Sequence, residues 1–298
     1  MRILISGATG MVANALIPLL HQHEIFKLVR RPLDGKNEII WDAEKGFSPE
    51  EENKLQGFDA VINLVGDNVA SGRWTPQKKL SIRNSRVLGT KNLIDALKRH
   101  NASPKVFISA SAIGFYGDRG DETLTEDSPR GKGFLAEICE EWEAEALRAR
   151  DLGSRVVLLR IGIVLAKEGG ALKKMLLPFS LGVGGVVGSG KQWMSWIALD
   201  DLTEIIKFSL ENDTLEGPVN CTAPNPVTNK EFTITLGKVL NRPTFIPLPS
   251  LLIKCIFGEM GETLLLQGNK VIPKKLLEKG FKFRYPDLEI ALRKILER

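Results

Sequence analysis

Short apolar runs alternate with longer amphipathic stretches along the first half of the chain. The runs are continuous rather than alternating, which is typical of strands covered on both faces of a sheet. They lie at residues 2–6, 25–29, 38–42, 59–66, 105–111 and 155–165. The longest stretches between them, 75–100 and 131–150, are predicted to be helices. This order predicts an α/β fold, a Rossmann-type doubly wound parallel sheet.

The regular alternation of apolar runs and long amphipathic stretches ends after residue 165, where glycines and prolines separate shorter elements. We expect residues 1–165 to form the Rossmann domain and residues 166–298 to form a smaller α+β C-terminal lobe, with strand 217–222 returning to the first sheet. Residues 281–285 alternate aromatic and basic side chains. The alternation predicts a half-buried strand, and the alternatives are a surface for a phosphate-bearing substrate or for nucleic acid.

A glycine-rich turn follows the first strand and leads into a helical stretch. Gly7 allows a tight turn, and Gly10 lets the backbone N–H groups at the helix start approach a pyrophosphate. A second strand follows the helix, which completes the βαβ unit of a dinucleotide-binding site. The residues expected to contact the coenzyme there are Gly7, Thr9, Gly10, Met11 and Val12. The end of the 59–66 strand should lie beside them and adds Leu64, Val65 and Gly66.

The end of the second strand predicts which coenzyme is bound. A site for NAD usually has an acidic residue there, whereas arginine suits the 2′-phosphate of NADP. This chain has Arg30 and Arg31 at that place and no acidic residue. NADP is therefore the expected coenzyme, with NAD as the less favoured alternative.

Composition narrows the class of protein further. Lysine and arginine exceed acidic residues by 41 to 36, and the excess lies in residues 270–298. The three cysteines lie far apart and the three histidines lie in no motif, so no metal site is expected. No apolar run is long enough to cross a bilayer. We expect a cytoplasmic protein that acts on a small molecule, without nucleic-acid or membrane partners. The oligomeric state is left open, with a homodimer as one alternative.

Further motifs accompany the glycine turn, and they span nearly the whole chain. They are Asn63–Gly66, Arg73–Thr75, Ser109–Ala112, Phe134–Ala136, Trp142–Glu143, Gly169–Leu172, Gly188–Gln192, Ser195–Ile197, Pro218–Asn220 and Pro226–Asn229. With these motifs the chain resembles the extended short-chain dehydrogenase/reductases, the NAD(P)-dependent epimerase/dehydratase superfamily. The resemblance is to the atypical epimerase-like branch with a distinct C-terminal domain. It implies a Rossmann domain that holds NAD(P) and a C-terminal lobe that holds the substrate, often a nucleotide sugar in the wider superfamily.

The resemblance also implies a catalytic pattern from which this chain departs. Short-chain dehydrogenases use a serine to orient the substrate oxygen, and Ser109 or Ser111 fits that role. They move a proton with a tyrosine whose pKa is lowered by a lysine four residues later. Neither tyrosine, Tyr116 or Tyr285, has such a lysine. The corresponding place is expected at Phe134, with Ile138 one helical turn later, and Lys132 is expected on the opposite face of that helix.

Three alternatives follow from the missing pair. Tyr116 could act alone as a weaker acid, or Cys139 with Glu137 or Glu140 could supply titratable groups. The third alternative is a catalytically silent, NADP-responsive sensor or scaffold. The branch usually has a histidine after the Trp-Ile pair, where this chain has Ala198. The sequence therefore predicts an NADP-binding protein, an oxidoreductase or epimerase that acts on an unknown carbonyl, hydroxyl or nucleotide-sugar compound.

Overall fold

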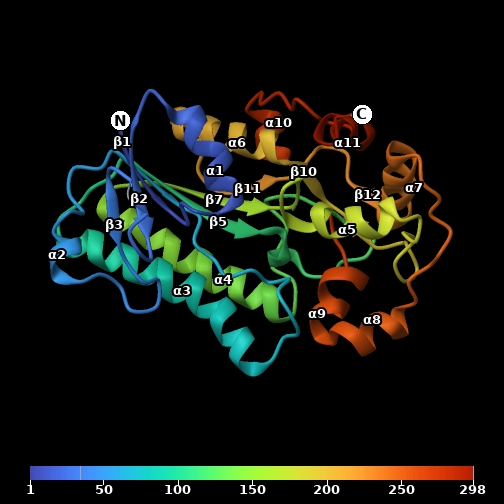
Figure 1. Cartoon of the computed structure of the whole chain (residues 1–298). Coiled ribbons are helices and arrows are strands. Elements are labelled where there is room, and N and C mark those ends of the chain that lie inside the picture. The colour runs from blue at the N-terminus through green and yellow to red at the C-terminus, as the bar shows by residue number, and fades with distance from the viewer. Residues whose placement is uncertain (34, 298) are drawn as a thin grey trace.

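The computed structural model describes residues 1–33 and 35–297. Its centre is a seven-stranded sheet in which all neighbouring strands are parallel, in the order β11-β7-β5-β4-β1-β2-β3 (Figure 1). The strands are β1 (Arg2–Ser6), β2 (Glu24–Val29), β3 (Glu38–Ile40), β4 (Ala60–Asn63), β5 (Val106–Ala112), β7 (Arg155–Ile161) and β11 (Gly217–Cys221). This is the predicted Rossmann-type doubly wound sheet, and the predicted return of the strand near residue 217 is confirmed.

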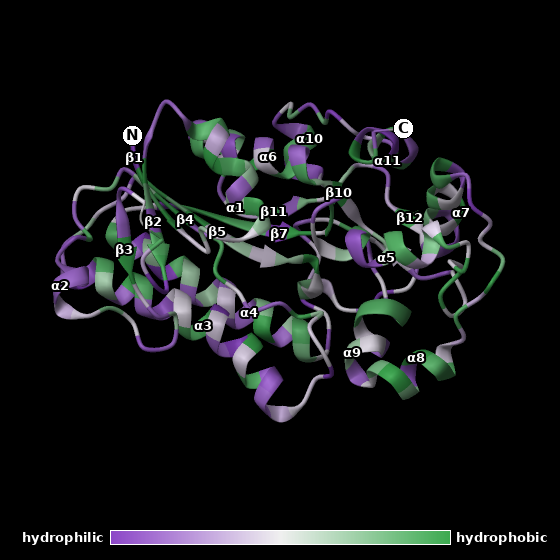
Figure 2. Ribbon diagram, viewed as in Figure 1, coloured by the Kyte–Doolittle hydropathy of each residue, from purple (hydrophilic) through white to green (hydrophobic). Residues whose placement is uncertain are grey.

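Helices cover both faces of the sheet. Side chains alternate along each strand, so Ile3 and Ile5 pack into a core cluster with α1 (Met11–Leu16) and α6 (Leu199–Glu211). Leu4 lies between them in sequence and packs into a second cluster, on the opposite face, with α3 (Pro76–Arg99) and α4 (Phe134–Leu147). Figure 2 shows the apolar strands enclosed between these two helical layers.

Local sequence explains where these helices begin and end. The Thr75 side chain accepts a hydrogen bond from the backbone N–H of Lys78, and Pro76 occupies the first position of α3. Pro18 explains why α1 is short. The α-helical geometry stops at Leu16, and the chain continues as the 3₁₀ helix η1 (Ile17–Leu20), which has the proline in its first turn.

Most of the remaining elements are in the C-terminal third or pack against it. The strands form three short pairs: β8 (Ile163–Leu165) with β10 (Trp196–Ala198), β9 (Trp193–Met194) with β12 (Val227–Thr228), and β6 (Thr123–Leu124) with β13 (Lys270–Val271). The helices are α2 (Pro49–Glu52), η2 (Ile113–Tyr116), η3 (Arg148–Leu152), α5 (Gly170–Ser180), α7 (Asn229–Leu240), α8 (Ser250–Phe257), α9 (Glu259–Gly261), η4 (Glu262–Leu266), α10 (Lys274–Glu278) and α11 (Leu288–Ile295). The lobe has its own apolar core, which includes Trp196, Phe232 and Leu292.

The predicted single strand at 155–165 is wrong in one respect. It is broken at Gly162, where a Cβ atom would lie 2.5 Å from the carbonyl oxygen of Ser195. The chain passes so close to the next segment there that only glycine fits. Beyond Gly162, β8 leaves the main sheet and pairs with β10.

The predicted strand at 281–285 is also wrong, although its pattern of burial is right. Tyr285 is buried while Lys282 and Arg284 are exposed, and the backbone is irregular. The backbone N–H groups of Arg284 and Tyr285 donate to the carboxylate of Asp201 rather than to a neighbouring strand. A buried carboxylate therefore replaces the sheet partner that the alternation suggested.

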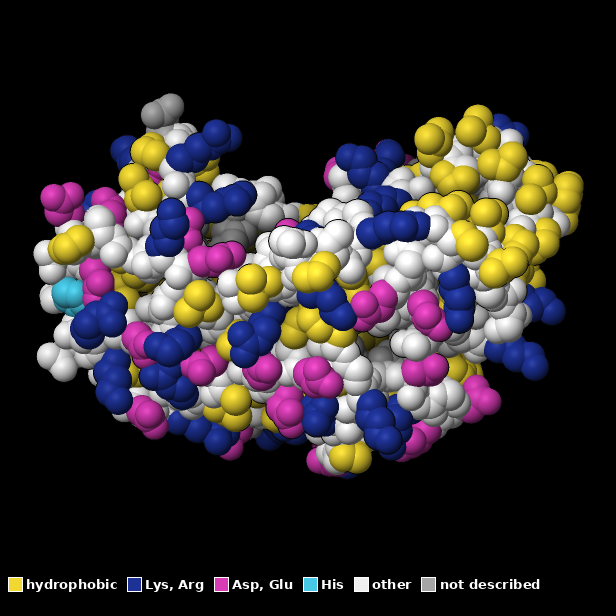
Figure 3. Space-filling view, turned by 90° about the horizontal axis from the view of Figure 1, so that it is seen from below, with side chains coloured by type: hydrophobic (Ala, Val, Ile, Leu, Met, Phe, Trp, Pro, Cys, Tyr) yellow, Lys and Arg dark blue, Asp and Glu magenta, His cyan; other side chains and the backbone are white. Residues whose placement is uncertain are grey.

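Exposed apolar side chains gather on the C-terminal lobe. Figure 3 shows them at the end of the molecule that carries α7 and α8 in Figure 1. The most exposed members of this group are Leu177, Leu181, Phe245 and Leu251. Within the described part of the chain, no helix is both long enough and apolar enough to cross a membrane.

Candidate functional site

The glycine turn has the geometry that close backbone contact requires. Gly7 has φ +65°, and a Cβ atom there would lie 2.5 Å from the carbonyl oxygen of Leu64. Gly10 caps α1 with extended backbone, donates its N–H to the Gly7 carbonyl at 2.9 Å, and no described side chain caps the helix. Thr9 and Gly10 are exposed, while Met11 and Val12 are half-buried. Glycine at position 7 thus allows the turn to lie directly against the loop after β4.

Both arginines after β2 are exposed. Arg30 and Arg31 lie at the carboxyl end of β2, the end of a parallel strand where ligands bind in this type of sheet. Neither forms an ion pair with any acidic residue of the described chain. Their guanidinium groups are therefore open to a phosphate.

A buried polar network fixes the start of the loop after β4. Asn63 accepts a hydrogen bond from the Ser6 hydroxyl at 2.6 Å and donates to Thr90 and Ser109 at 2.8 and 3.2 Å. Ser6 also accepts from the backbone N–H of Leu64. Ser109 is fully buried in this network. Its hydroxyl therefore supports the loop, and it lies outside the cavity described next.

A cavity of about 990 Å³ opens where β4, β5 and β7 end. Segments on opposite sides of it are far apart in the sequence. The part from the sheet comprises residues 64–66, 110–114 and 161–163. The part from α3, from α4 and from the loop before α4 includes Ile82, Arg86, residues 132–136, Ile138, Cys139 and Trp142. The C-terminal lobe adds Trp193, Ser195, Glu259, Thr263, Leu264 and residues 267–269. Leu64, Val65 and Gly66 thus join the predicted coenzyme loop to this cavity.

Ser111 lies in the cavity wall with its hydroxyl held in one direction. It donates to Oε1 of Glu143 at 2.7 Å. That carboxylate is in turn held by Arg160, whose Nε and Nη2 donate to Oε1 and Oε2, both at 2.8 Å. Because the Ser111 proton is committed to Glu143, the free lone pairs of its oxygen are what remains to accept a hydrogen bond from a ligand.

Tyr116 lies on the far side of this network and away from the cavity. Its side chain is fully buried, its hydroxyl donates to Asn220 at 2.7 Å, and it accepts from Arg160 at 2.9 Å. Burial raises the pKa of Tyr116 to about 12, although Arg160 opposes the shift. The tyrosine links η2 to β11, and this placement opposes a role as the proton donor.

The position at which the family's catalytic tyrosine is expected, at the start of α4, is apolar. Phe134 packs edge-on against Trp74 with ring centroids 5.1 Å apart. Burial raises the pKa of the neighbouring Cys139 thiol to about 12, so it is protonated near neutral pH. Glu137 and Glu140 are exposed and do not line the cavity. Ala198 is buried in the core of the lobe.

The placement predicted for Lys132 is wrong. The helix begins at Phe134 rather than near residue 131, so Lys132 precedes it in an exposed loop. From there it lines the cavity instead of facing away from it. The cavity therefore has a lysine, but the tyrosine that would work with it is missing.

Comparison with known proteins agrees with this geometry. A model of the NAD dependent epimerase/dehydratase family matches residues 3–221, which ends with the last residue of β11. The chain belongs to this family. A second model, a domain of unknown function (DUF1731), matches residues 248–295.

Several epimerase-family proteins are similar over most or all of their length. Epimerase family protein Mb2239 of Mycobacterium bovis is 40% identical over 97% of this chain and 95% of its own. The chloroplastic SDR39U1 homolog of Arabidopsis thaliana is 41% identical over 100% of this chain and 87% of its own. The crystal structure of human epimerase family protein SDR39U1 with NADPH is 36% identical, has a TM-score of 0.89 and covers 100% of both chains.

Three residues of this epimerase-family site were missed by sequence reasoning. Arg160 was visible only as the charge that interrupts the apolar run after residue 155, and Glu143 only as part of the Trp-Glu motif. Arg86 gave no signal, because it is one of many cations in a long helix. The structure brings all three to the cavity or to the network behind it.

Proposed function

We propose that this protein is an NADP-dependent oxidoreductase or epimerase of the epimerase/dehydratase family, acting on a small carbonyl, hydroxyl or nucleotide-sugar compound. The observation that supports this best is the position of Ser111. Its oxygen lies in the wall of a 990 Å³ cavity that also includes Leu64–Gly66 of the expected coenzyme loop. The human relative crystallised with NADPH supports the choice of coenzyme.

The residues present fit NADP. Gly7 makes room for the turn, the N–H groups at the start of α1 face the expected pyrophosphate, and Arg30 with Arg31 would hold the 2′-phosphate. When bound, NADP supplies or accepts the hydride. We assign the coenzyme to residues 1–165 together with strand 217–222, and the substrate to the lobe formed by residues 166–298.

Ser111 would position the substrate oxygen. Glu143 orients the Ser111 hydroxyl, and Arg160 holds that carboxylate in place through two hydrogen bonds. A substrate hydroxyl could then donate to the Ser111 oxygen, which would fix the position of that hydroxyl in the cavity. Without the usual tyrosine, the substrate's proton would be exchanged with water, and positioning of this kind would then support hydride transfer at a lower rate.

A silent NADP-responsive sensor or scaffold is the second candidate. This candidate is favoured by the residues at the start of α4. Phe134 stands where the family's tyrosine is expected, and the neighbouring Cys139 thiol stays protonated. In this role the cavity binds a ligand whose occupancy depends on the coenzyme, and no bond is broken.

Turnover separates the two candidates. Protein saturated with NADPH or NADP⁺ is incubated with a panel of carbonyls, alcohols and nucleotide sugars, and absorbance at the nicotinamide band and the epimer composition of the products are followed. We expect turnover that falls at least about tenfold in Ser111→Ala and is unchanged in Ser189→Ala, a matched change in an exposed loop. Coenzyme binding without turnover of any compound would support the sensor instead.

A further inference from the structure

An exposed apolar surface on the C-terminal lobe, here called the apolar face, is assembled from two stretches of the chain. The first is the second half of α5 with the loop that follows it, and the second runs from the loop after α7 through α8. Figure 3 shows how its side chains gather at one end of the molecule. They are between 45% and 78% exposed and comprise Leu177, Leu181, Val183, Phe245, Ile246, Leu251, Leu252 and Ile256.

Backbone contacts fix the two loops of the apolar face to each other. The N–H of Leu248 donates to the carbonyl of Val186 at 2.8 Å. Gly185 pairs with Phe245 in an antiparallel bridge, and a Cβ atom at Gly185 would lie 1.7 Å from the Ile246 carbonyl oxygen. Because paired and closely packed backbone holds Phe245 and Ile246 at the surface, little conformational entropy is lost when they contact a partner.

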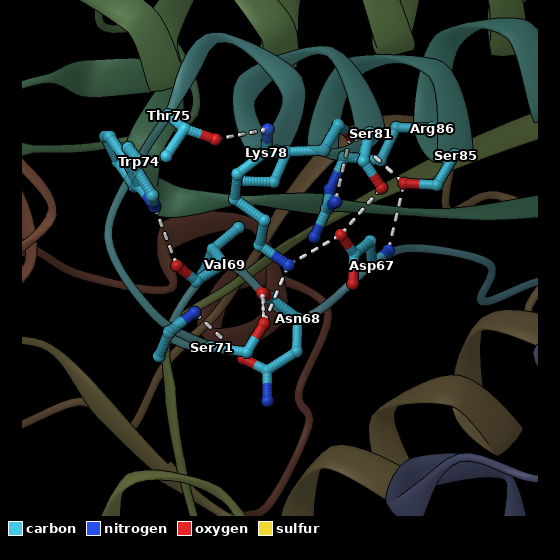
Figure 4. Close-up of polar contacts among 12 residues, drawn as sticks. Asp67, Asn68, Val69, Ser71, Trp74, Thr75, Lys78, Ser81, Ser85 and Arg86 are labelled. Atoms are coloured by element: carbon cyan, nitrogen blue, oxygen red, sulfur yellow. Dashed lines mark hydrogen bonds and ion pairs between the residues drawn. The ribbon is translucent and has the colours of Figure 1, made fainter.

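The helix of the apolar face is anchored by the loop between β4 and α3. Nε of Arg73 in that loop donates to the carbonyl of Ile256 in α8 at 2.8 Å. The loop is itself held by Lys78, whose Nζ donates to Asp67 at 2.6 Å and to Ser71 at 2.7 Å (Figure 4). The outer side of α8 is therefore a fixed part of the surface.

The two stretches that carry the apolar face are basic. Residues 169–191 contain three lysines, residues 238–258 contain two lysines and an arginine, and neither stretch contains an acidic residue. Two of these six cations, Lys238 and Lys254, pair with glutamates that lie outside the stretches. The face as a whole thus has more positive than negative charge around it.

Two exposed cations lie directly at the border of the apolar face. Lys173 precedes Leu177 by four residues in α5, so both lie on the same side of that helix. Nε of Arg242 donates to the carbonyl of Ser180 at 2.8 Å, which places this arginine beside the end of α5. Neither cation forms an ion pair with an acidic residue that the structure describes. Their charge is therefore available to an anionic partner.

A broad apolar area with a cationic border fits the surface of an anionic lipid bilayer. Apolar side chains enter the boundary of the acyl chains, while long basic side chains reach the phosphates of the head groups. A second copy of the chain fits less well. A two-fold contact would bring the same positive border on both copies together, and like charges repel.

We propose that the apolar face attaches this protein to the surface of membranes that contain anionic lipids. The proposal goes beyond the proposed function and depends on neither the coenzyme nor the reaction. The sequence predicts no membrane partner only through the length of its apolar runs, and a surface assembled from short stretches gives no such signal. Because α8 leads into α9 and η4, which add Glu259, Thr263 and Leu264 to the cavity wall, attachment would place that wall near the bilayer.

Vesicle flotation tests the proposal on the whole chain. The protein is mixed with vesicles of phosphatidylcholine alone, or of phosphatidylcholine with about one third phosphatidylglycerol, and the bound fraction is measured at two salt concentrations. We expect binding to the anionic vesicles to be at least about tenfold stronger than to the neutral ones, and to weaken as salt is added. Equal binding to both kinds of vesicle, or binding to neither, would overturn the proposal.

Apolar substitutions show whether this face makes the contact. Phe245→Ser with Leu251→Ser should weaken binding to the anionic vesicles at least about tenfold. The matched control is Leu80→Ser with Ile290→Ser, which changes side chains of α3 and α11 that are 56% and 55% exposed and lie outside the face. An equal loss in both double variants would contradict the assignment.

Charge substitutions test the border separately. Lys173→Gln with Arg242→Gln should weaken binding to the anionic vesicles about tenfold and leave binding to the neutral ones unchanged. Lys98→Gln with Arg150→Gln removes two exposed cations from α3 and η3 and should change binding by less than about twofold. A larger loss in this control than in the border variant would mean that net charge, and not the border, attracts the lipid.

Light scattering distinguishes the rival occupant. A wild-type dimer that Phe245→Ser with Leu251→Ser converts to a monomer, without vesicle binding by either protein, would make the face an interface between copies, and the proposal would be wrong. Protein that binds anionic vesicles but neither coenzyme would contradict the proposed function and leave this proposal standing.

Discussion

The glycine turn and the cavity lie at the same edge of one sheet, but they are built in different ways. The turn depends on backbone: Gly7 and Gly10 lie within four residues of one another and need no side chain to shape the site. The cavity depends on side chains from β5, α3, α4, β7 and the C-terminal lobe. The first region keeps its family's pattern, and the second has lost the pair of residues that usually moves the proton.

This difference shows which parts of a function a fold retains most easily. Backbone groups at a helix start bind an anion in many sequence contexts, provided that the turn can form. Side-chain chemistry needs particular residues on separate elements, and a change in one of them alters the reaction. Here Ser111 remains, and behind it lies a Glu143–Arg160 pair rather than a tyrosine and a lysine.

The largest effect is expected from breaking the buried pair behind the cavity. Arg160→Met leaves the carboxylate of Glu143 buried without its cation, which should reduce the free energy of unfolding by about 3–5 kcal/mol. Urea denaturation measures the loss. Lys254→Ala removes one partner of an exposed pair with Glu262 and should cost less than about 1 kcal/mol.

The double variant sharpens this test. Glu143→Met with Arg160→Met removes both charges, so it should be more stable than Arg160→Met alone. A double variant whose loss equals the sum of the two single losses would show that the two residues do not act as a pair.

The next effect concerns the backbone of the turn. Gly7→Ala puts a Cβ atom 2.5 Å from the Leu64 carbonyl oxygen at φ +65°, and strain of this kind costs about 1–3 kcal/mol. NADPH affinity, measured by coenzyme fluorescence, should fall about tenfold or more as the turn shifts.

Gly153→Ala is the control for conformation alone. Gly153 also has positive φ, at +81°, and no described atom within 4 Å of an added Cβ. It should lose about 1 kcal/mol of stability and keep the wild-type NADPH affinity. Equal NADPH affinity in both variants would contradict the role assigned to the turn.

A smaller and more selective effect is expected at the carboxyl end of β2. The double change Arg30→Ala with Arg31→Ala removes charge-assisted hydrogen bonds to the 2′-phosphate, which should weaken NADPH binding about tenfold or more. NADH affinity should not change. Lys36→Ala removes an exposed cation from the same loop and should affect neither coenzyme. A parallel loss of NADH binding would show that the arginines serve the fold instead.

The smallest expected effect is a pH dependence of the free energy of unfolding. It arises at Glu126, which lies outside the glycine turn and the cavity lining. Burial raises the pKa of Glu126, whose Oε1 accepts from the backbone of Asn220 and Lys275. Its Oε2 has no partner in the described chain. Because the folded protein holds this proton more tightly than the unfolded chain, the stabilising contribution is complete at low pH. It is lost as pH rises through the raised pKa.

Glu126→Gln keeps the accepting oxygen and removes the charge. The free energy of unfolding of this variant should exceed that of the wild type by about 1 kcal/mol at pH 8 and should equal it at pH 4. Urea denaturation at the two pH values measures both differences. Glu50→Gln changes an exposed carboxylate and should show no such trend. A gain at pH 4 that matches the gain at pH 8 would rule out the titration of Glu126 as its cause.

The sequence predicted those features that depend on neighbouring residues. The βαβ order, the turn at Gly7, the long helix that follows Thr75 and the family were all accessible in this way. These features follow from local conformational preference and from apolar spacing, which a short window of sequence contains.

The remaining features depend on contacts between distant segments. Arg160 and Glu143 are 17 residues apart, and Tyr116 meets Asn220 across 104 residues. No local pattern shows that the Tyr116 hydroxyl is bound to Asn220, or that Arg86 forms no ion pair with any acidic residue that the structure describes. The polar network beside the cavity could therefore be defined only after the fold had brought these side chains together.

The most direct test of the account is a titration of the purified wild-type protein with NADPH and with NADH under identical conditions. Arg30 and Arg31 predict one site per chain and a dissociation constant for NADPH at least about tenfold lower than for NADH. Failure to bind either coenzyme, or tighter binding of NADH, would contradict it.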